Sequence, residues 1–234
     1  RKCGPASTYP SRSLRSVPQK AISAPPVTRG VDEKERYRRQ VVLPEIGSRG
    51  QARLRRSHAV LVGVGALGCV SADLLVRAGL GHLRLVDRDV VETVNLQRQT
   101  LYAEADVDRP KAEAAADRLR SVNSSVRIDA VAKDVHAATV EDVVSGADLI
   151  VDGTDNLETR YLLNEAALDA KIPFIYGGAV GTFGMVFSAQ SPKTACFRCL
   201  NPSMPAPGTL PTCETAGILN AVSAQVGAIQ AGEA

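Results

Sequence analysis

A glycine-rich turn between an apolar segment and a helical segment limits the folds open to this chain more than any other feature. Residues 57–63 (SHAVLVG) are short and apolar, which is typical of a buried parallel strand. They run into GVGALG at residues 63–68, which matches G-x-G-x-x-G. Residues 66–78 follow with helical spacing, and one face holds Leu67, Val70, Leu74 and Leu75. This order of elements is typical of the first unit of a doubly wound α/β domain.

Strands and helices keep alternating after this unit. Further strands are expected at residues 82–87, 126–131, 147–152 and 173–176, and helices at residues 110–119, 156–171 and 216–234. Residues 181–190 follow a strand without an intervening helix, so we expect an antiparallel strand there. The predicted fold class is α/β, a doubly wound, Rossmann-like and mainly parallel sheet with an antiparallel C-terminal extension.

The chain divides into a basic tail and a body. Residues 1–31 hold six basic residues, no acidic residue and many Ser and Pro, so a disordered tail is expected, with a transit peptide as the alternative. Residues 32–234 form the predicted domain, whose 22 basic and 25 acidic residues argue against nucleic-acid binding by bulk charge. The chain starts with Arg and its last helix has no terminator, which favours a fragment truncated at its C-terminus.

The cysteine content and the length of the apolar runs indicate the cellular compartment of the protein. Five Cys in 234 residues is far below the density of a secreted disulfide scaffold. No apolar run reaches the roughly eighteen residues of a membrane span. A cytoplasmic protein is expected, unless the basic tail directs it to an organelle.

The glycine turn predicts nucleotide binding. Gly63, Gly65 and Gly68 allow a tight turn and a close approach of the backbone, and a helix N-terminus favours phosphate. Asp87 lies at the end of the second expected strand, where a carboxylate accepts hydrogen bonds from ribose hydroxyls. These residues alone do not distinguish ATP from NAD.

Further polar residues gather where ligands bind in such sheets, at the carboxyl ends of the strands. They are Asp89, Asn95, Arg98, Gln99, Lys111, Asp155 and Asn156. Arg98 and Lys111 are candidates for neutralising phosphates, and Asp155 or a neighbour for holding magnesium. Each also has a simpler role, since exposed basic residues form surface ion pairs and Asp155 is placed to cap a helix.

Taken together, five motifs in one order resemble a known family. They are RYRRQ at residues 36–40, GVGALG at 63–68, NLQRQT at 95–100, PK at 110–111 and DGTDN at 152–156. From about Glu33 to its end, the chain is similar to the ThiF/MoeB/HesA adenylyltransferases, relatives of the ubiquitin-activating enzymes. The resemblance implies ATP-dependent activation of the C-terminal Gly-Gly carboxylate of a ubiquitin-like sulfur carrier, in thiamine or molybdopterin biosynthesis.

The same resemblance implies roles for single residues. In the related enzymes, the residue that matches Asp87 binds ribose, and the residues that match Arg98 and Lys111 hold phosphates. The residue that matches Asp155 supports magnesium. The match to Arg39 reaches the nucleotide of a partner subunit, which implies a homodimer. Ala66 is a departure, because relatives carry Gly there, but its methyl group is small enough that we expect binding to survive.

The cysteines have separate expected roles. Cys196 and Cys199 have the spacing of half a tetrahedral zinc site, with a redox pair as the alternative. The resemblance places the other two zinc ligands beyond the end of the chain, so zinc is expected in the full-length protein. It also implies that the Cys213 thiol bonds covalently to the carrier or to sulfur. Cys69 is expected to be a small core residue.

Three other functions remain open on the sequence. An NAD-dependent oxidoreductase fits the glycine turn but leaves Arg39, Arg98 and Lys111 without roles. A non-catalytic module that binds a ubiquitin-like protein is the second, and a relative that adenylates a tRNA-borne carboxylate is the third. For the preferred function, a cysteine desulfurase or a rhodanese domain is a possible sulfur donor.

Overall fold

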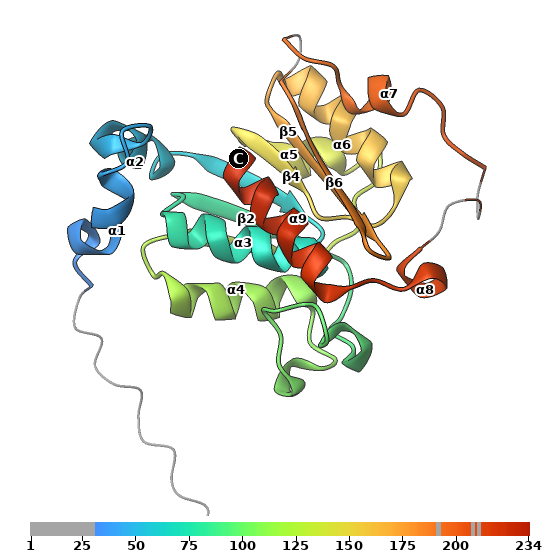
Figure 1. Cartoon of the computed structure of the whole chain (residues 1–234), viewed down its shortest axis with the longest axis horizontal. Helices are drawn as coiled ribbons and strands as arrows, with labels where there is room; N and C mark the ends of the chain where they lie inside the picture. Colours follow the sequence, from blue (N-terminus) through green and yellow to red (C-terminus); the bar gives the residue numbers. More distant parts are fainter. Residues whose placement is uncertain (1–30, 191–192, 207–208, 210–211) are drawn as a thin grey trace, which may run out of the picture.

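The computed structural model describes residues 31–190, 193–206, 209 and 212–234 (Figure 1). The basic tail expected at residues 1–31 therefore lies outside the described residues except for Val31. No helix in the described ranges has the length and apolar character needed to cross a membrane.

A single six-stranded sheet forms the centre, with the strand order β3-β2-β1-β4-β5-β6. The strands are β1 (His58–Val62), β2 (His82–Val86), β3 (Arg127–Val131), β4 (Leu149–Asp152), β5 (Phe174–Val180) and β6 (Phe183–Ala189). Strands β1 to β5 pair in parallel, and β6 runs antiparallel to β5. The predicted mainly parallel sheet with an antiparallel extension is confirmed.

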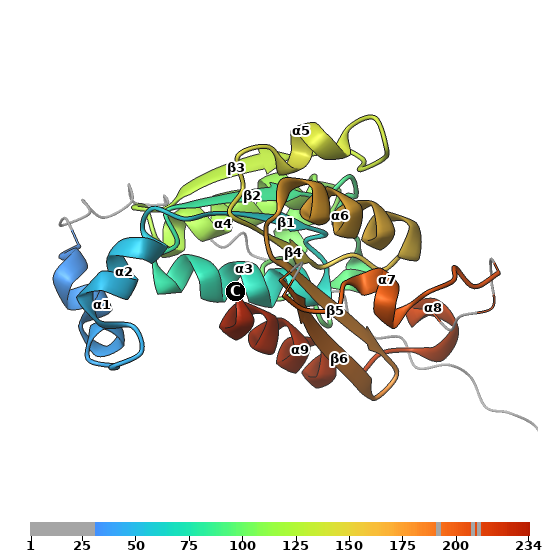
Figure 2. The same ribbon diagram turned by 90° about the horizontal axis from the view of Figure 1, so that it is seen from above.

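Helices cover both faces of this sheet (Figure 2). One face carries α3 (Ala66–Ala78), α4 (Lys111–Val122) and α9 (Asn220–Glu233), and the other carries α5 (Val140–Val144), α6 (Leu157–Ala170) and the short α7 (Phe197–Leu200). The buried strands present alternate side chains to the two cores, so Leu61 joins the first core and Val60 the second. Doubly wound packing follows from this alternation.

Two N-terminal helices were not among the predicted elements. Both α1 (Glu33–Val41) and α2 (Gly47–Leu54) contain no buried residue. Polar groups dock them instead: the Gln40 amide donates to Gln51 Oε1 at 2.7 Å and to Ala78 O at 2.9 Å. These helices contain no residue that is fully buried, so a search of the sequence for buried apolar segments does not find them.

Two expectations about helices are wrong. Leu74 was expected on the buried face of α3, but it is 37% exposed and lines a shallow groove with Ala228 and Ala231 of α9. The helix expected over residues 216–234 is interrupted, because α8 (Cys213–Ala216) ends at Gly217 and Ile218 bridges to Gly181 before α9 starts. Gly217 has a φ of 71°, which a continuing right-handed helix does not allow.

Candidate functional site

The glycine turn brings two strand ends into backbone contact. Gly63 has a φ of 87°, and a Cβ atom there would lie 2.6 Å from the Gly153 carbonyl carbon. A Cβ atom on Gly68 would lie 2.0 Å from Gly63 O, so neither position tolerates a side chain. The N-cap of α3 is Gly65, and no side chain among the described residues caps it. The first N–H groups of α3 therefore remain available for an anion at this edge of the sheet.

Asp87 is held against the turn in an orientation suited to a sugar. Its Oδ2 accepts a hydrogen bond from Val64 N at 2.7 Å, and its Oδ1 accepts one from Asp89 N at 2.8 Å. Burial raises the pKa of Asp87, and these two bonds together with the nearby Lys111 charge oppose that rise. Each carboxylate oxygen keeps a second lone pair, which leaves acceptors for a pair of ribose hydroxyls.

Lys111 is a buried cation next to the same turn. Its side chain is only 8% exposed, and its Nζ lies 3.1 Å from Asp89 Oδ2. The backbone is fixed as well, because Lys111 N donates to Asp89 O at 2.9 Å. A buried ammonium group with a single carboxylate partner keeps donors for a phosphate oxygen.

Tyr102 links Lys111 to the turn, and the sequence analysis missed it. Its hydroxyl donates to Val64 O at 2.8 Å and lies 3.2 Å from Lys111 O. Burial raises the pKa of Tyr102, so the hydroxyl stays protonated and keeps donating. The available signal was an aromatic residue in the polar segment between Gln99 and Lys111, which a search for charged residues passes over.

The segment after β2 places the three other predicted binding residues at the same edge. Gln99 is 4% exposed with its Oε1 unpaired among the described residues, and its Nε2 lies 3.7 Å from where a Gly65 Cβ would stand. Asn95 Oδ1 accepts from Glu92 N at 3.1 Å and so shapes the loop. Arg98 lines a surface pocket of about 210 Å³ and donates to Val94 O at 3.0 Å. An orphaned buried amide beside a bare helix N-terminus indicates a ligand that completes its hydrogen bonding.

The loop after β4 completes this edge. Asp155 is exposed, while Asn156 caps α6 by accepting a hydrogen bond from Thr159 N at 2.9 Å. Asn156 therefore has a structural role, whereas the Asp155 carboxylate has no hydrogen-bond or ion-pair partner among the described residues. The loop packs against the glycine turn, because a Cβ atom on Gly153 would lie 2.2 Å from Gly63 O.

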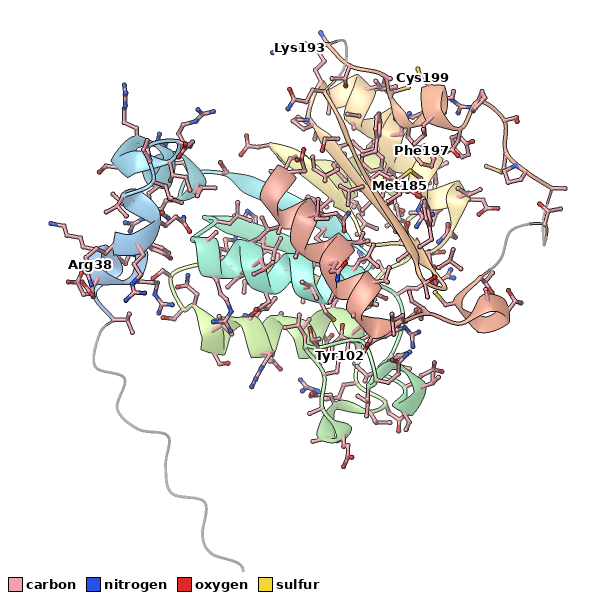
Figure 3. All side chains as sticks on the ribbon, viewed as in Figure 1. Arg38, Tyr102, Met185, Lys193, Phe197 and Cys199 are labelled. Carbon is pink, nitrogen blue, oxygen red and sulfur yellow. The ribbon has the colours of Figure 1, made fainter. Side chains whose placement is uncertain are left out.

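Arg39 does not reach this edge within the chain. It is exposed on α1, where Tyr37 packs under Gly79 at the end of α3 and Arg36 donates to Val122 O at the end of α4. Its neighbour Arg38 lies at the far end of the molecule from Tyr102 in Figure 3. The amino ends of the strands, and not their carboxyl ends, face these helices.

The cysteines lie in three different environments. Cys69 is fully buried, and burial raises the pKa of its thiol to about 12, so the expectation of a core residue is confirmed. The Sγ atoms of Cys196 and Cys199 lie 3.7 Å apart, and no third potential metal ligand joins them in the described ranges. Partial burial opposes ionisation of Cys196, but hydrogen bonds from Cys199 and Arg198 outweigh it and lower the pKa of that thiol. Cys213 opens α8 with its Sγ 4.0 Å from Ala179 O at the carboxyl end of β5.

Comparison with known proteins gives consistent matches. The model of the ThiF family matches residues 37–234. The chain is 45% identical to the sulfur carrier protein ThiS adenylyltransferase of Bacillus subtilis, over 85% of this chain and 59% of that protein. It is 43% identical to the SAMP-activating enzyme E1 of Haloferax volcanii, over 86% and 74%, and 41% identical to the adenylyltransferase and sulfurtransferase MOCS3 of Mus musculus, over 97% and 49%. The chain thus spans between about half and three quarters of the length of these relatives.

Solved structures share the fold. Escherichia coli MccB, in a crystal structure with ATP, superposes with a TM-score of 0.67 at 24% identity, over 78% of this chain and 55% of that chain. TcdA (CsdL) superposes with a TM-score of 0.60 at 28% identity, over 64% and 60%. Because the identity to MccB is only 24%, this match shows a shared fold and nothing more.

Proposed function

The chain belongs to the ThiF family, and from this premise we propose that it is an ATP-dependent adenylyltransferase acting on a ubiquitin-like sulfur carrier. The reaction joins the C-terminal Gly-Gly carboxylate of the carrier to AMP and releases pyrophosphate. The activities named for these relatives support this proposal. The observation that carries it is that Asp87 binds the N–H of Val64 in the glycine turn, while Tyr102 ties the carbonyl of Val64 to Lys111.

The chemistry needs cations more than a base. A C-terminal carboxylate has a pKa of about 3.5, so it is ionised at neutral pH and attacks without losing a proton. A carboxylate oxygen forms a bond to the α-phosphorus, and the bond from that phosphorus to the bridging oxygen breaks as pyrophosphate leaves. Because both reactants are anions, catalysis rests on positioning and on positive charge. Lys111, Arg98 and the N-terminus of α3 supply that charge, and Asp87 fixes the ribose.

Magnesium fits the carboxyl edge of the sheet. Mg²⁺ bound with a nucleotide commonly uses one or two protein carboxylates together with phosphate oxygens and water. Asp155 is an exposed carboxylate in the loop that packs on the glycine turn, so it would hold the ion. The ion would neutralise phosphate charge. The described residues contain no group of three potential metal ligands.

Zinc fits Cys196 and Cys199 as half of a site. Their sulfur atoms are close enough to share one ion, and Phe197 between them is fully buried and anchors the pair. We propose that two ligands from the full-length protein complete a structural zinc site, because a closed site needs four ligands.

Two further roles concern partners. We propose that the Cys213 thiol, beside the carboxyl end of β5, takes part in one of two steps. It attacks the acyl-adenylate of the carrier, which forms a thioester and releases AMP, or it takes the outer sulfur of a persulfide on a cysteine desulfurase or a rhodanese domain, whose thiol then leaves. We also propose a homodimer in which Arg39 reaches the nucleotide of the partner subunit. Within one chain, α1 lies near the amino ends of the strands, whereas the candidate site lies at their carboxyl ends.

The deciding experiment is ATP–pyrophosphate exchange with the full-length protein, magnesium and candidate carriers that end in Gly-Gly. Exchange that depends on the carrier would establish the reaction, and the preferred carrier would identify the thiamine or molybdopterin pathway. A folded, zinc-loaded protein that gives no exchange with any carrier would contradict the proposal. Binding of NAD in place of ATP would favour an oxidoreductase, and binding of the carrier without exchange would favour a non-catalytic module.

A further inference from the structure

A buried ion pair lies next to the loop that contains Asp155. Asp152, the last residue of β4, is completely buried, and the side chain of Arg160 on α6 is 12% exposed. Arg160 Nε donates to Asp152 Oδ2 at 3.1 Å. The motifs of the sequence analysis and the proposed reaction assign Arg160 no role, yet burying two charges is costly unless each is fully partnered.

The remaining hydrogen bonds of Arg160 both go to backbone carbonyls. Its Nη2 donates to Thr154 O at 2.5 Å and to Gly177 O at 3.3 Å. The same guanidinium therefore ties the loop after β4 to strand β5. The other oxygen of the Asp152 carboxylate accepts Thr154 N at 2.9 Å and Thr154 Oγ1 at 2.6 Å. Thr154 is thus held through its N–H, its hydroxyl and its carbonyl, one residue before Asp155.

Packing behind the guanidinium restricts its position. Its Cζ lies 5.0 Å from the centroid of the Tyr176 ring, and the Tyr176 ring lies 5.0 Å from that of the fully buried Phe197. On the other side, Gln230 of α9 donates to Asp152 O at 2.7 Å. Helices α6 and α9 and strand β5 therefore converge on the residue that precedes the loop.

We propose that Arg160 is a positioning residue that sets the conformation of residues 153–155 and so presents the Asp155 carboxylate to the nucleotide. This role rests on the proposed adenylyltransferase function. Arg160 touches neither nucleotide nor carrier; it acts through the carbonyl of Thr154. This role requires a guanidinium group, which carries several N–H donors. A lysine would supply the charge for Asp152 but would not reach the Thr154 and Gly177 carbonyls together.

The test variant is Arg160→Lys. Removing the charge, as in Arg160→Met, would leave Asp152 buried without a cation, and a loss of activity would then report only on folding. Arg84→Lys is the matched control, because the Arg84 guanidinium also holds backbone carbonyls, Val143 O at 2.7 Å and Ser145 O at 3.1 Å, away from the candidate site.

The first readout is hydrogen exchange of the Thr154 amide in the full chain, which does not depend on activity. We expect Arg160→Lys to speed this exchange by about tenfold or more, while the melting temperature stays close to that of Arg84→Lys. The second readout is carrier-dependent ATP–pyrophosphate exchange, in which we expect a drop of roughly ten- to a hundredfold, because small displacements of a positioned group are costly. Raising the Mg²⁺ concentration should restore part of this loss.

Unchanged Thr154 exchange in Arg160→Lys would overturn the proposal, whatever the activity. Faster exchange with full activity would also overturn it, since the loop would then not need this conformation. If wild-type protein shows no carrier-dependent exchange at all, the adenylyltransferase function fails by itself. The affinity for ATP with Mg²⁺ then decides the role of Arg160: weaker binding in Arg160→Lys than in Arg84→Lys supports it, and equal binding overturns it.

Discussion

At the scale of single residues, the site depends on charges that are buried before any ligand arrives. Lys111 faces Asp89, and Asp87 accepts two backbone N–H groups beside it. A preorganised cation stabilises charge more than a mobile surface lysine does, because it needs no rearrangement during the reaction. Residue identity at these positions therefore affects the reaction more than it affects the fold.

Replacing Lys111 with alanine should lower carrier-dependent ATP–pyrophosphate exchange by about 10²-fold or more, because one buried phosphate donor is lost. The measurement is the exchange rate at saturating ATP, with circular dichroism to show that the fold persists. Lys133→Ala, at an exposed position, is the control and should exchange at the wild-type rate. Unchanged turnover in Lys111→Ala would remove this residue from the site.

His58 makes stability depend on pH. Its ring stacks on His82 with centroids 3.7 Å apart, and its Nδ1 lies 2.8 Å from Gly146 O. Burial lowers the pKa of His58, and the neighbouring His82 and Arg84 lower it further. The neutral ring is therefore favoured in the folded state, and this contribution is complete above the unfolded pKa of about 6.5 and is lost as the pH falls through the lowered folded pKa.

The free energy of unfolding should thus fall on acidification below about pH 6.5, and His58→Phe should flatten this fall while keeping an aromatic ring. The slope can change by at most about 1.4 kcal/mol per pH unit for one proton. Urea denaturation between pH 5 and pH 7.5 gives this slope. A slope in His58→Phe equal to that of the wild-type protein would show that His58 does not titrate in this range.

At the scale of elements, close contact between α3 and α9 holds α9 next to the candidate site. Ser71 Oγ on α3 donates to Gly227 O on α9 at 2.9 Å. A Cβ atom on Gly227 would lie 2.5 Å from Leu67 O, so the two helices pack backbone against backbone there. Helix α9 also carries Gln230 to the end of β4, which makes its position relevant to the nucleotide site.

Two alanine substitutions in α9 should therefore have opposite effects. Gly227→Ala should lower the free energy of unfolding by about 1–3 kcal/mol, because α9 must move away from α3. Gly232→Ala in the same helix should raise it by about 0.5 kcal/mol, because its Cβ would meet no atom within 4 Å and alanine favours the helix. Thermal denaturation of both variants measures the difference. Equal effects would mean that the α3–α9 contact is not tight.

At the scale of the whole molecule, the carboxyl ends and the amino ends of the strands lie next to different groups of predicted site residues. The glycine turn, Asp87, Lys111 and Asp155 lie at the carboxyl ends of the strands, whereas α1 with Arg39 lies beyond their amino ends (Figure 1). A chain with this layout cannot bring Arg39 to its own nucleotide without moving α1. In the proposed homodimer, Arg39 of a second copy of the chain would reach this nucleotide.

Mixing Arg39→Ala and Asp155→Ala subunits tests this geometry. Each variant alone should be inactive in ATP–pyrophosphate exchange, but a purified heterodimer should recover about half of the wild-type activity, since one of its two sites is then intact. Arg38→Ala, next along α1, is the control and should be active as a homodimer. Absence of recovery in a demonstrated heterodimer would place Arg39 outside the partner's site.

The sequence by itself determined the order of the six strands and of helices α3, α4 and α6 between them, the site of the glycine turn and the charged residues at the strand ends. These features are local, because apolar spacing, glycine content and the residue that follows a strand depend on neighbours in the chain. The predicted bounds of α3, residues 66–78, agree with the structure, and the antiparallel β6 follows from the missing helix before it.

Only the tertiary structure decided which distant groups meet. Tyr102 donates to the Val64 carbonyl 38 residues before it, and Arg160 donates to the carbonyls of Thr154 and of Gly177, 17 residues after it. No periodicity in the sequence marks such hydrogen bonds to backbone. The docking of α1 and α2 by polar contacts and the break at Gly217 before α9 depend equally on the packed chain. Burial creates these requirements, because a polar group taken out of water needs a partner that the folded arrangement alone provides.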